Sequence, residues 1–355
     1  MRRKIQGRGY FRKKNSKGRS LSAWLYGLIA MLCLLYGAIF FWPVVPPNPN
    51  AVDLPVFKVK IKPQSGLTSI SDQLKGQGIH VSTVPFQISA RILFVGSKLK
   101  PGTYLLPTQA SLGTILLQFA KGDRVRESIA IIPGMTIWQL RSLVDAHPAL
   151  IHSTKGMSSK ELMNILNLNY PGPEGLFLPD TYTFDPDELD SSIYRRASQA
   201  MQKQLTQMWL QKETASPLKT PYDLLILASI VEKETGRSGD RGLVAAVFTN
   251  RLTKGMMLQT DPTIIYGIGP KFDGNLRKAD LRKNSPYNTY MHKGLPPTPI
   301  AMPSKESLQA SIHPAMSNAL YFVAKGDGTS QFSQSLSEHE AAVNQYQRKL
   351  NPPSQ

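Results

Sequence analysis

The sequence predicts an α+β protein with a single N-terminal transmembrane helix, a small α+β domain and a larger, helix-rich α+β domain. Three features predict this arrangement: one uncharged apolar run near the N-terminus, short alternating segments after it, and longer helical periodicities in the second half of the chain. The chain has 355 residues, which is long enough for two domains beyond a targeting segment.

Residues 23–43 are predicted to form a transmembrane anchor. Ala23 to Trp42 runs for about 20 residues without a charge, which matches the hydrocarbon thickness of a bilayer, and aromatic residues lie near both of its ends. A signal peptide would have a shorter apolar core and a small-residue cleavage site. Nine of the 42 basic residues lie in the first 19 positions. We therefore predict that residues 1–22 are a basic cytoplasmic tail.

The basic tail places the remainder of the chain outside the cytoplasm. The only cysteine, Cys33, lies within the anchor, so the exported part has neither a disulfide nor thiol chemistry. Bacterial periplasm would suit such a protein. A basic tail can also bind nucleic acid, but the flank of an anchor accounts for it, and no nucleic-acid partner is predicted.

Residues 44–56 are predicted to be a Pro-rich linker, and residues 57–155 a small α+β region. Strands are expected where apolar residues alternate with others, over 57–62, 102–106 and 128–132. Helices are expected after Gly66 and over 85–95 and 111–119, with a further one after Gly134.

Two segments of the small region repeat one pattern. A strand and a short turn lead into Gly-Leu-Thr-Ser-Ile at residue 66, and again into Gly-Met-Thr-Ile-Trp at residue 134. Strand–helix–helix–strand units that begin in this way resemble LysM modules, which bind the glycan strands of peptidoglycan and chitin. A small α+β spacer domain without a ligand fits the pattern equally well.

Residues 156–350 are predicted to form the larger domain. A long amphipathic helix is expected over 192–213, and prolines separate it from a second helix over 224–236. Glycine and proline become frequent in the second half of this domain, which predicts a cleft lined by ordered loops rather than a simple helical bundle. A last strand is expected over 319–324.

The helix over 224–236 places one carboxylate in its own apolar face. At about 100° per residue, Glu234 lies about 20° from Leu227, whereas Glu232 falls on the polar side with Lys233. A carboxylate at the C-terminal end of a helix, among apolar neighbours, is disfavoured in its charged form. Its pKa should therefore rise toward the range that a general acid needs near neutral pH.

The helical pattern leaves two interpretations of Glu234 open. A general acid of this kind is common in glycoside cleavage. The alternative is a structural glutamate that pairs with an arginine, such as Arg237, Arg241 or Arg251. Glu232 is expected to be a surface partner of Lys233 or of a nearby base.

Other chemistries lack support in the sequence. The zinc-protease, phosphate-loop, serine-hydrolase and dinucleotide motifs do not occur, and the six histidines show no metal-ligand spacing. We therefore predict no cofactor and no metal. Catalysis by a carboxylate side chain is therefore the chemistry that the sequence still supports.

Two segments downstream of Glu234 carry side chains that suit a sugar site. Tyrosine rings stack on the apolar faces of sugars, and amide and hydroxyl groups bond to sugar hydroxyls. Ordinary turn chemistry is the alternative, particularly for Asn288. The candidate substrate-binding residues are Gln259, Thr260, Asp261, Tyr287 and Asn288.

The motifs IVEKET, NRLxxGMxLQTDPTxIYG, PYNTYxxxGLPP and HPAxxxxLYFVA stand in this order in the chain. They make it similar to the YceG-like (MltG) family of endolytic murein transglycosylases, over nearly the whole length after the anchor. In that family the second glutamate of EKET is catalytic, which implies Glu234. Thr298 stands where the family often has glycine, and Met302-Pro303-Ser304 where it often has Asn-Pro-Gly, so the resemblance leaves the loop shape and substrate contacts there undefined.

The resemblance implies a lyase that cleaves the β-1,4 bond between N-acetylmuramic acid and N-acetylglucosamine in nascent glycan strands. The products would carry 1,6-anhydromuramoyl ends, and strand elongation would stop. The implied partners are peptidoglycan glycan strands, the bacterial inner (cytoplasmic) membrane and peptidoglycan synthases. The alternative is a membrane-anchored, peptidoglycan-binding scaffold of the cell-wall synthesis machinery that cuts nothing.

Overall fold

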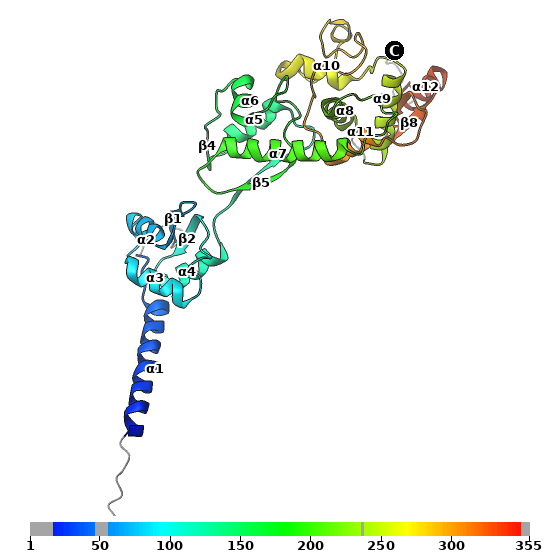
Figure 1. The fold of residues 1–355 in the computed structure, drawn as a ribbon. Helices are drawn as coiled ribbons and strands as arrows, with labels where there is room; N and C mark the ends of the chain where they lie inside the picture. The colour runs from blue at the N-terminus through cyan, green and yellow to red at the C-terminus, as the bar shows by residue number, and fades with distance from the viewer. Residues whose placement is uncertain (1–16, 47–55, 236–237, 349–355) are drawn as a thin grey trace, which may run out of the picture. The chain divides into compact units, whose positions relative to one another are not determined.

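The computed structural model describes residues 17–46, 56–235 and 238–348, and Figure 1 shows the order of its helices and strands. The chain divides into two compact units, Met1–Arg126 and Glu127–Gln355. Both contain helices and strands, which confirms the predicted α+β class. Most of the predicted basic tail and of the predicted linker lies outside the described residues.

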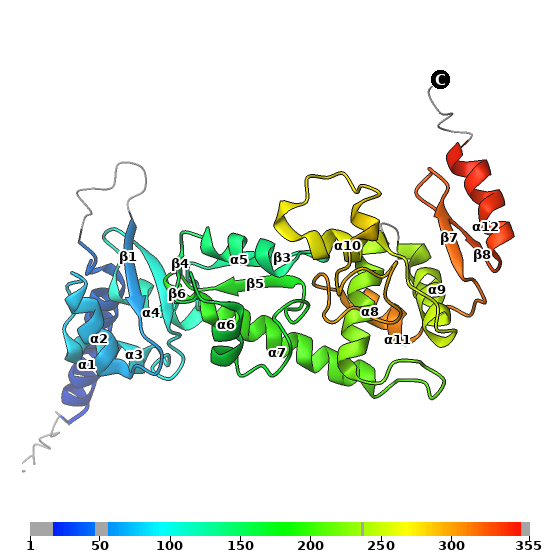
Figure 2. The same ribbon diagram turned by 90° about the horizontal axis from the view of Figure 1, so that it is seen from above.

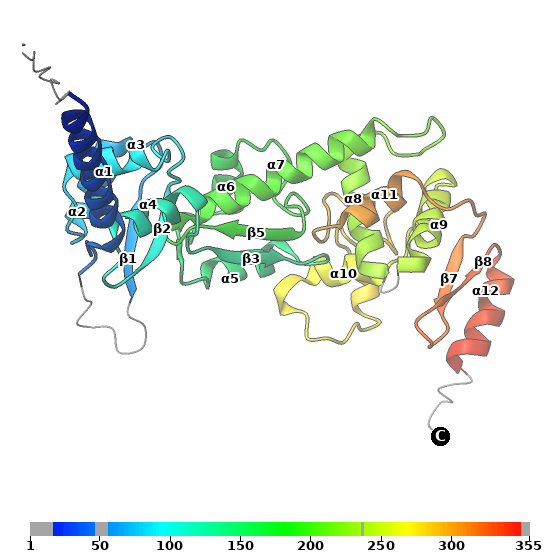
Figure 3. The same ribbon diagram turned by 90° about the horizontal axis from the view of Figure 1, so that it is seen from below.

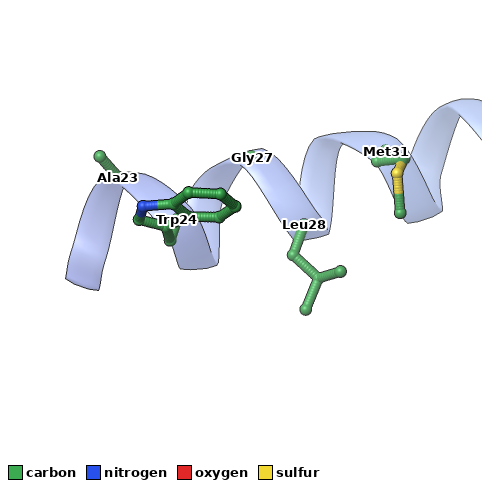
Figure 4. Close-up of a pocket in the computed structure, with 5 residues that line it drawn as sticks. All are labelled: Ala23, Trp24, Gly27, Leu28 and Met31. Atoms are coloured by element: carbon green, nitrogen blue, oxygen red, sulfur yellow. The ribbon is translucent and has the colours of Figure 1, made fainter. Parts of the chain in front are cut away.

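The first unit begins with α1 (Lys17–Phe41), a helix whose segment Ala23–Phe41 is long and apolar enough to cross a membrane. Between Ala23 and Phe41 its side chains are almost all exposed, as a single membrane-spanning helix requires. One stretch of the helix bears a shallow apolar hollow (Figure 4), which is lined by Ala23, Trp24, Gly27, Leu28 and Met31. The helix is compatible with single-pass anchoring.

A strand–helix–helix–strand motif follows α1, as predicted. Its strands pair antiparallel, with Lys58 opposite Leu105, and its helices bury Phe86 and Phe119 against the sheet. Ser111 caps the last helix of the unit by accepting from the Thr114 N–H. The elements are β1 (Val56–Ile61), α2 (Leu67–Gly76), α3 (Thr83–Ile92), β2 (Gly102–Pro107) and α4 (Leu112–Lys121).

The segment directly after α1 is packed into this unit and differs from the expected spacer. The Val44 N–H donates to Ala110 O at 2.9 Å, and Val44 O accepts from the His80 N–H at 2.9 Å. Val45 is buried in the core. Since apolar side chains and backbone hydrogen bonds both hold these residues, the chain enters the domain as soon as the helix ends.

The second unit starts at β3 (Glu127–Ile131), well before the expected boundary at residue 156. The physical reason is strand pairing: β3 pairs antiparallel with β5 (Asp180–Phe184), and Ile129 and Leu140 belong to the core of this unit. The second repeat of the sequence thus begins another strand–helix–helix–strand motif, in the larger unit, with a two-residue strand between its helices. Its further elements are α5 (Ile137–Asp145), β4 (Leu150–Ile151), α6 (Ser159–Leu166), β6 (Glu188–Leu189) and α7 (Asp190–Trp209).

Helix α8 (Pro221–Glu234) runs through the middle of the rest of this unit. Residues 224–231 are all buried, because α8 packs against α7, α9, α10 and α11. Figures 2 and 3 show β7, β8 and α12 grouped together beside α9. These elements are α9 (Arg241–Thr253), α10 (Asp261–Ile268), α11 (Lys305–Ile312), β7 (Tyr321–Ala324), β8 (Ser330–Ser333) and α12 (Leu336–Val343).

Candidate active site

Helix α8 is fixed at its start and presents Glu234 at its end. Thr220 accepts from the Asp223 N–H at 3.1 Å, Asp223 accepts from the Thr220 N–H at 3.0 Å, and Pro221 occupies the first turn. The helix stops at Glu234, and Thr235 is extended. The carboxylate therefore projects from the last turn, as the sequence predicted.

Thr260 is the hydrogen-bond partner of Glu234. Its hydroxyl donates to Glu234 Oε1 from a buried position just before α10. Two further threonines hold it: the Thr260 N–H donates to Thr289 Oγ1 at 3.1 Å, and Thr263 Oγ1 donates to Thr260 O at 2.7 Å. The donor to Glu234 is thus built into a small buried hydroxyl network.

The surroundings favour the protonated form of Glu234. Burial raises the pKa of its carboxyl; the hydrogen bond from Thr260 lowers it, and the nearby Asp261 charge raises it again. The net direction is upward, as the sequence predicted. Within the described part of the chain Glu234 forms no ion pair with Arg241 or Arg251, and Arg237 lies outside that part.

Gln259 and Asp261 are the neighbours of Thr260 in the sequence, and both line the same pocket as Glu234. Asp261 Oδ1 accepts from the Tyr290 hydroxyl at 2.7 Å. Gln259 adopts a left-handed backbone with a φ of 48°, which is uncommon for a residue other than glycine. Its N–H donates to Thr289 O at 3.1 Å, and its side chain is exposed.

A pocket of ≈ 560 Å³ lies in front of Glu234. Its lining includes two walls, one from the loop before α10 and one from β7 and α12. Arg251 supports both walls, because its guanidinium donates to Leu258 O at 2.9 Å and to Leu320 O at 2.6 Å. The polar and aromatic side chains around the pocket include Glu234, Gln259, Asp261, Tyr290, Arg251, Tyr321, His339 and Gln347.

Tyr287 and Asn288 do not line this pocket in the described part of the chain. The Tyr287 hydroxyl lies 2.8 Å from Thr298 Oγ1. The buried Asn288 amide donates to Leu281 O at 3.0 Å and to Lys283 O at 2.8 Å. Asn288 therefore holds the loop that carries Tyr290, which is the turn role left open above.

Glu232 has a different role from the expected surface pair with a basic residue. It accepts from the Ser304 N–H at 2.9 Å and from the Ser307 hydroxyl at 2.7 Å, at the start of α11. The side of α8 that looked polar is covered by α11 and by the segment before it, since Ser229 there accepts from the Ile300 N–H. The prediction for Glu232 was wrong because this neighbour is distant in sequence.

Two notable groups were not among the predicted site residues. Glu174 is buried and accepts from the Ile137 N–H at 3.0 Å, and burial raises its pKa to about 7. Tyr290 donates to Asp261; it lies in the PYNTY segment that suggested a sugar site, but it was not chosen as a candidate residue.

Elsewhere in the second unit, Asp145, His152 and Asp190 bring possible metal-ligand atoms within 4.8 Å of one another. Serine and threonine donors already occupy both oxygens of Asp190.

Residues 59–345 match the model of the YceG-like family. The chain belongs to the YceG-like family. All the residues of the pocket up to Val343 fall within the matched range. The family assignment covers both the strand–helix–helix–strand motifs and the helical part that contains Glu234.

Several relatives of this family member are known. The endolytic murein transglycosylase of Bacillus subtilis is 31% identical over 333 residues, which cover 88% of this chain and 89% of that protein. The endolytic murein transglycosylase of Streptococcus pneumoniae is 35% identical over 185 residues, 50% of this chain and 33% of that protein. A crystal structure of a YceG-like protein from Listeria monocytogenes aligns with a TM-score of 0.50 and 28% identity, over 81% of this chain and 99% of that one.

Proposed function

We propose that this protein is an endolytic lytic transglycosylase that cleaves the β-1,4 bond between N-acetylmuramic acid and N-acetylglucosamine in peptidoglycan. Family membership and the names of the two relatives support the reaction class. The observation that carries the proposal is Glu234 itself: a carboxyl with a raised pKa, one hydroxyl donor and a pocket in front of it.

The first step is proton transfer from Glu234 to the glycosidic oxygen. As the bond from that oxygen to C1 of the muramoyl residue breaks, the leaving N-acetylglucosamine keeps the proton, and positive charge develops at C1. The substrate's own N-acetyl group stabilises this charge. Asp261 favours this step, because its negative charge keeps Glu234 protonated in the resting enzyme.

The second step uses the same residue as a base. The Glu234 carboxylate takes the proton from the 6-hydroxyl of the muramoyl residue, whose oxygen attacks C1 and closes the 1,6-anhydro ring. Glu234 is then protonated again, so the cycle consumes no water. Ordinary glycosidases need two carboxyl groups, whereas one is sufficient here.

The remaining candidate residues fall into two groups, those close to Glu234 and those farther from it. Gln259, Thr260 and Asp261 are proposed to contact the sugar or to position Glu234. Tyr287 and Asn288 are proposed to act through the loop geometry that they support. No cofactor is required by either step.

The proposed location is the bacterial inner membrane, with the tail in the cytoplasm and both folded units in the periplasm. Helix α1 supports anchoring, and the basic residues before it support this orientation. The first strand–helix–helix–strand unit is proposed to be LysM-like and to contact glycan strands. Such a tether would hold the catalytic unit near nascent strands and near peptidoglycan synthases.

The test is a digest of purified peptidoglycan with the chain from residue 43 onward, which keeps the segment packed into the first unit, analysed by mass spectrometry. Wild type should release anhydromuramoyl ends. Glu234→Gln should lower the rate by about 10²–10⁴-fold, as expected for loss of a general acid and base, while Glu232→Gln should cut normally when folded. Reducing ends would indicate a hydrolase instead, and no cleavage by folded wild type would favour the non-catalytic scaffold.

A further inference from the structure

Helix α3 carries an exposed apolar stripe that no described part of the chain covers. Val84, Ile88 and Ile92 recur every fourth residue and so share one side of the helix. Their exposed fractions are 64%, 42% and 41%. Single exposed apolar residues are ordinary, but an aligned row of them on one short helix marks an interaction surface.

The stripe points away from the domain core and continues past the end of the helix. Phe86 and Ala90 are buried on the other side of α3. Phe94 follows the helix with a φ of 55°, in the left-handed region, and is 83% exposed. Bulky residues seldom adopt this backbone, yet here an ordered turn holds an aromatic ring out in the solvent.

The same end of the unit is fastened to α1. Gly113 in α4 approaches α1 so closely that a Cβ atom there would lie 2.9 Å from the ring of Phe40. Helix α3 packs beside α4, and Figures 1 and 3 show both helices where α1 joins the unit. Helix α3, which carries the stripe, therefore lies near the level at which α1 would leave the hydrocarbon core.

The charge of this unit suits an anionic surface. Residues 56–126 contain ten lysines and arginines, two aspartates and no glutamate. Arg91 lies beside the stripe on α3, and Lys98 follows it, both exposed. An apolar row flanked by cations fits the boundary between phospholipid headgroups and acyl chains.

We propose that α3 and Phe94 form a membrane-contact surface, which lies in the headgroup region of an anionic bilayer beside α1. The proposal rests on the proposed anchoring by α1 and is independent of the chemistry at Glu234. The continuity with α1 and the basic flank select lipid as the occupant. With two attachments, the first unit would hold one fixed orientation on the membrane.

The experiment places a fluorophore at single cysteines in the full chain, in nanodiscs of equimolar phosphatidylcholine and phosphatidylglycerol. In a Cys33→Ala background, Phe94→Cys probes the surface, and Leu105→Cys is the matched control. Leu105 is exposed on β2, where it projects from the sheet. The native Cys33, near the middle of the apolar span of α1, reports insertion of α1 through a second nitroxide placed deep on the lipid acyl chain. A nitroxide on the lipid near the headgroup should quench the label at 94 and shift its emission to the blue, and leave the label at 105 unchanged.

Charge reversal tests the electrostatic part of the proposal. Arg91→Glu with Lys98→Glu should lower the quenching at 94 with phosphatidylglycerol present and change it less in phosphatidylcholine alone. Equal signals at 94 and 105, with Cys33 quenched, would overturn the contact surface and leave the anchor intact. An unquenched Cys33 would overturn both. If the label at 94 is shielded to a degree that depends on the protein density and not on the lipid quencher, the surface contacts a second copy of the chain. That result would overturn the proposed lipid contact.

Discussion

Glu232 and Glu234 stand two residues apart on α8 and have opposite surroundings. Glu232 binds the start of α11 through the backbone N–H of Ser304 and the hydroxyls of Ser304 and Ser307. Glu234 accepts from Thr260 alone among the described residues, and it borders the pocket. A carboxylate with several fixed donors is committed to structure, whereas one with a single donor beside a pocket remains available for proton transfer.

Glu174 shows that burial alone does not separate the two roles. Its carboxyl is more buried than that of Glu234, and burial raises its pKa to about 7. However, it accepts from the backbone N–H of Ile137 at the start of α5 and is also hydrogen-bonded with Tyr266 and the Gly175 backbone. It does not line the Glu234 pocket. Access to the pocket, rather than a raised pKa, is what sets Glu234 apart.

The largest effect on stability is expected at Glu174. Its pKa is about 7 in the folded protein and 4.5 ordinarily, so between these values the folded state binds a proton that the unfolded state releases. The contribution of Glu174 to the free energy of unfolding is fully present below about pH 4.5 and should fall by about 3 kcal/mol as the pH rises through 7. Glu174→Gln should remove this decline.

Urea unfolding of the chain from residue 43 onward, at pH 5 and pH 8, measures this difference. The tryptophans that remain in that fragment, Trp138 and Trp209, both lie in the second unit. Glu306→Gln, at an exposed glutamate in the first turn of α11, is the matched control and should keep the decline. If Glu174→Gln keeps it as well, Glu174 is not the group that titrates.

Glu232→Gln should destabilise the fold and spare the chemistry. The substitution removes the charge that three donors from Ser304 and Ser307 share, and a hydrogen bond to a charged group contributes about 1.5–3 kcal/mol. We expect a loss of about 2 kcal/mol in the free energy of unfolding, on the scale of one such bond. The rate of glycan cleavage per folded molecule should stay near that of wild type. A loss of rate without a loss of stability would reverse the roles of the two glutamates.

In the comparison of Glu232 with Glu234, helical periodicity correctly predicted the feature that depends on α8 alone. It placed Glu234 in the apolar face of α8 because helical spacing is set by the sequence itself. It failed for Glu232 because the covering helix, α11, is some seventy residues away along the chain. The predicted domain boundary at residue 156 was wrong for the same reason. Strand β3 belongs to the second unit because it pairs with β5, and a local sequence pattern does not reveal that pairing.

The candidate site shows the same limit. Thr260 and Asp261 were identified from hydrogen-bonding side chains close to one proline, and both reach Glu234 or its pocket. Asn288 was selected by residue type, and the structure turns its amide toward two backbone carbonyls instead. Residue type indicates what a side chain can bind, whereas loop geometry decides what it meets.

The smallest effect is expected for Thr260→Val. This substitution removes the one hydroxyl that donates a hydrogen bond to Glu234. Valine keeps the shape of threonine but cannot donate, and the lost hydrogen bond had lowered the pKa of Glu234. The pKa should therefore rise, the protonated acid should persist to higher pH, and the alkaline limb of kcat/KM should move upward. The plateau rate should change by about tenfold or less, since one hydrogen bond contributes about 1 kcal/mol net.

Two companion variants make the Thr260 experiment specific. Thr260→Ser keeps the hydroxyl and should restore the wild-type pH profile. Thr263→Val removes a hydroxyl from the same buried network, where it contacts Thr260 and Thr289 but not Glu234, and it should leave the limb in place. If the limb stays fixed in Thr260→Val, or moves equally in Thr263→Val, the group that titrates is not Glu234. Glu234 and Glu232 would then be distinguished only by where their side chains lie, and not by their titration.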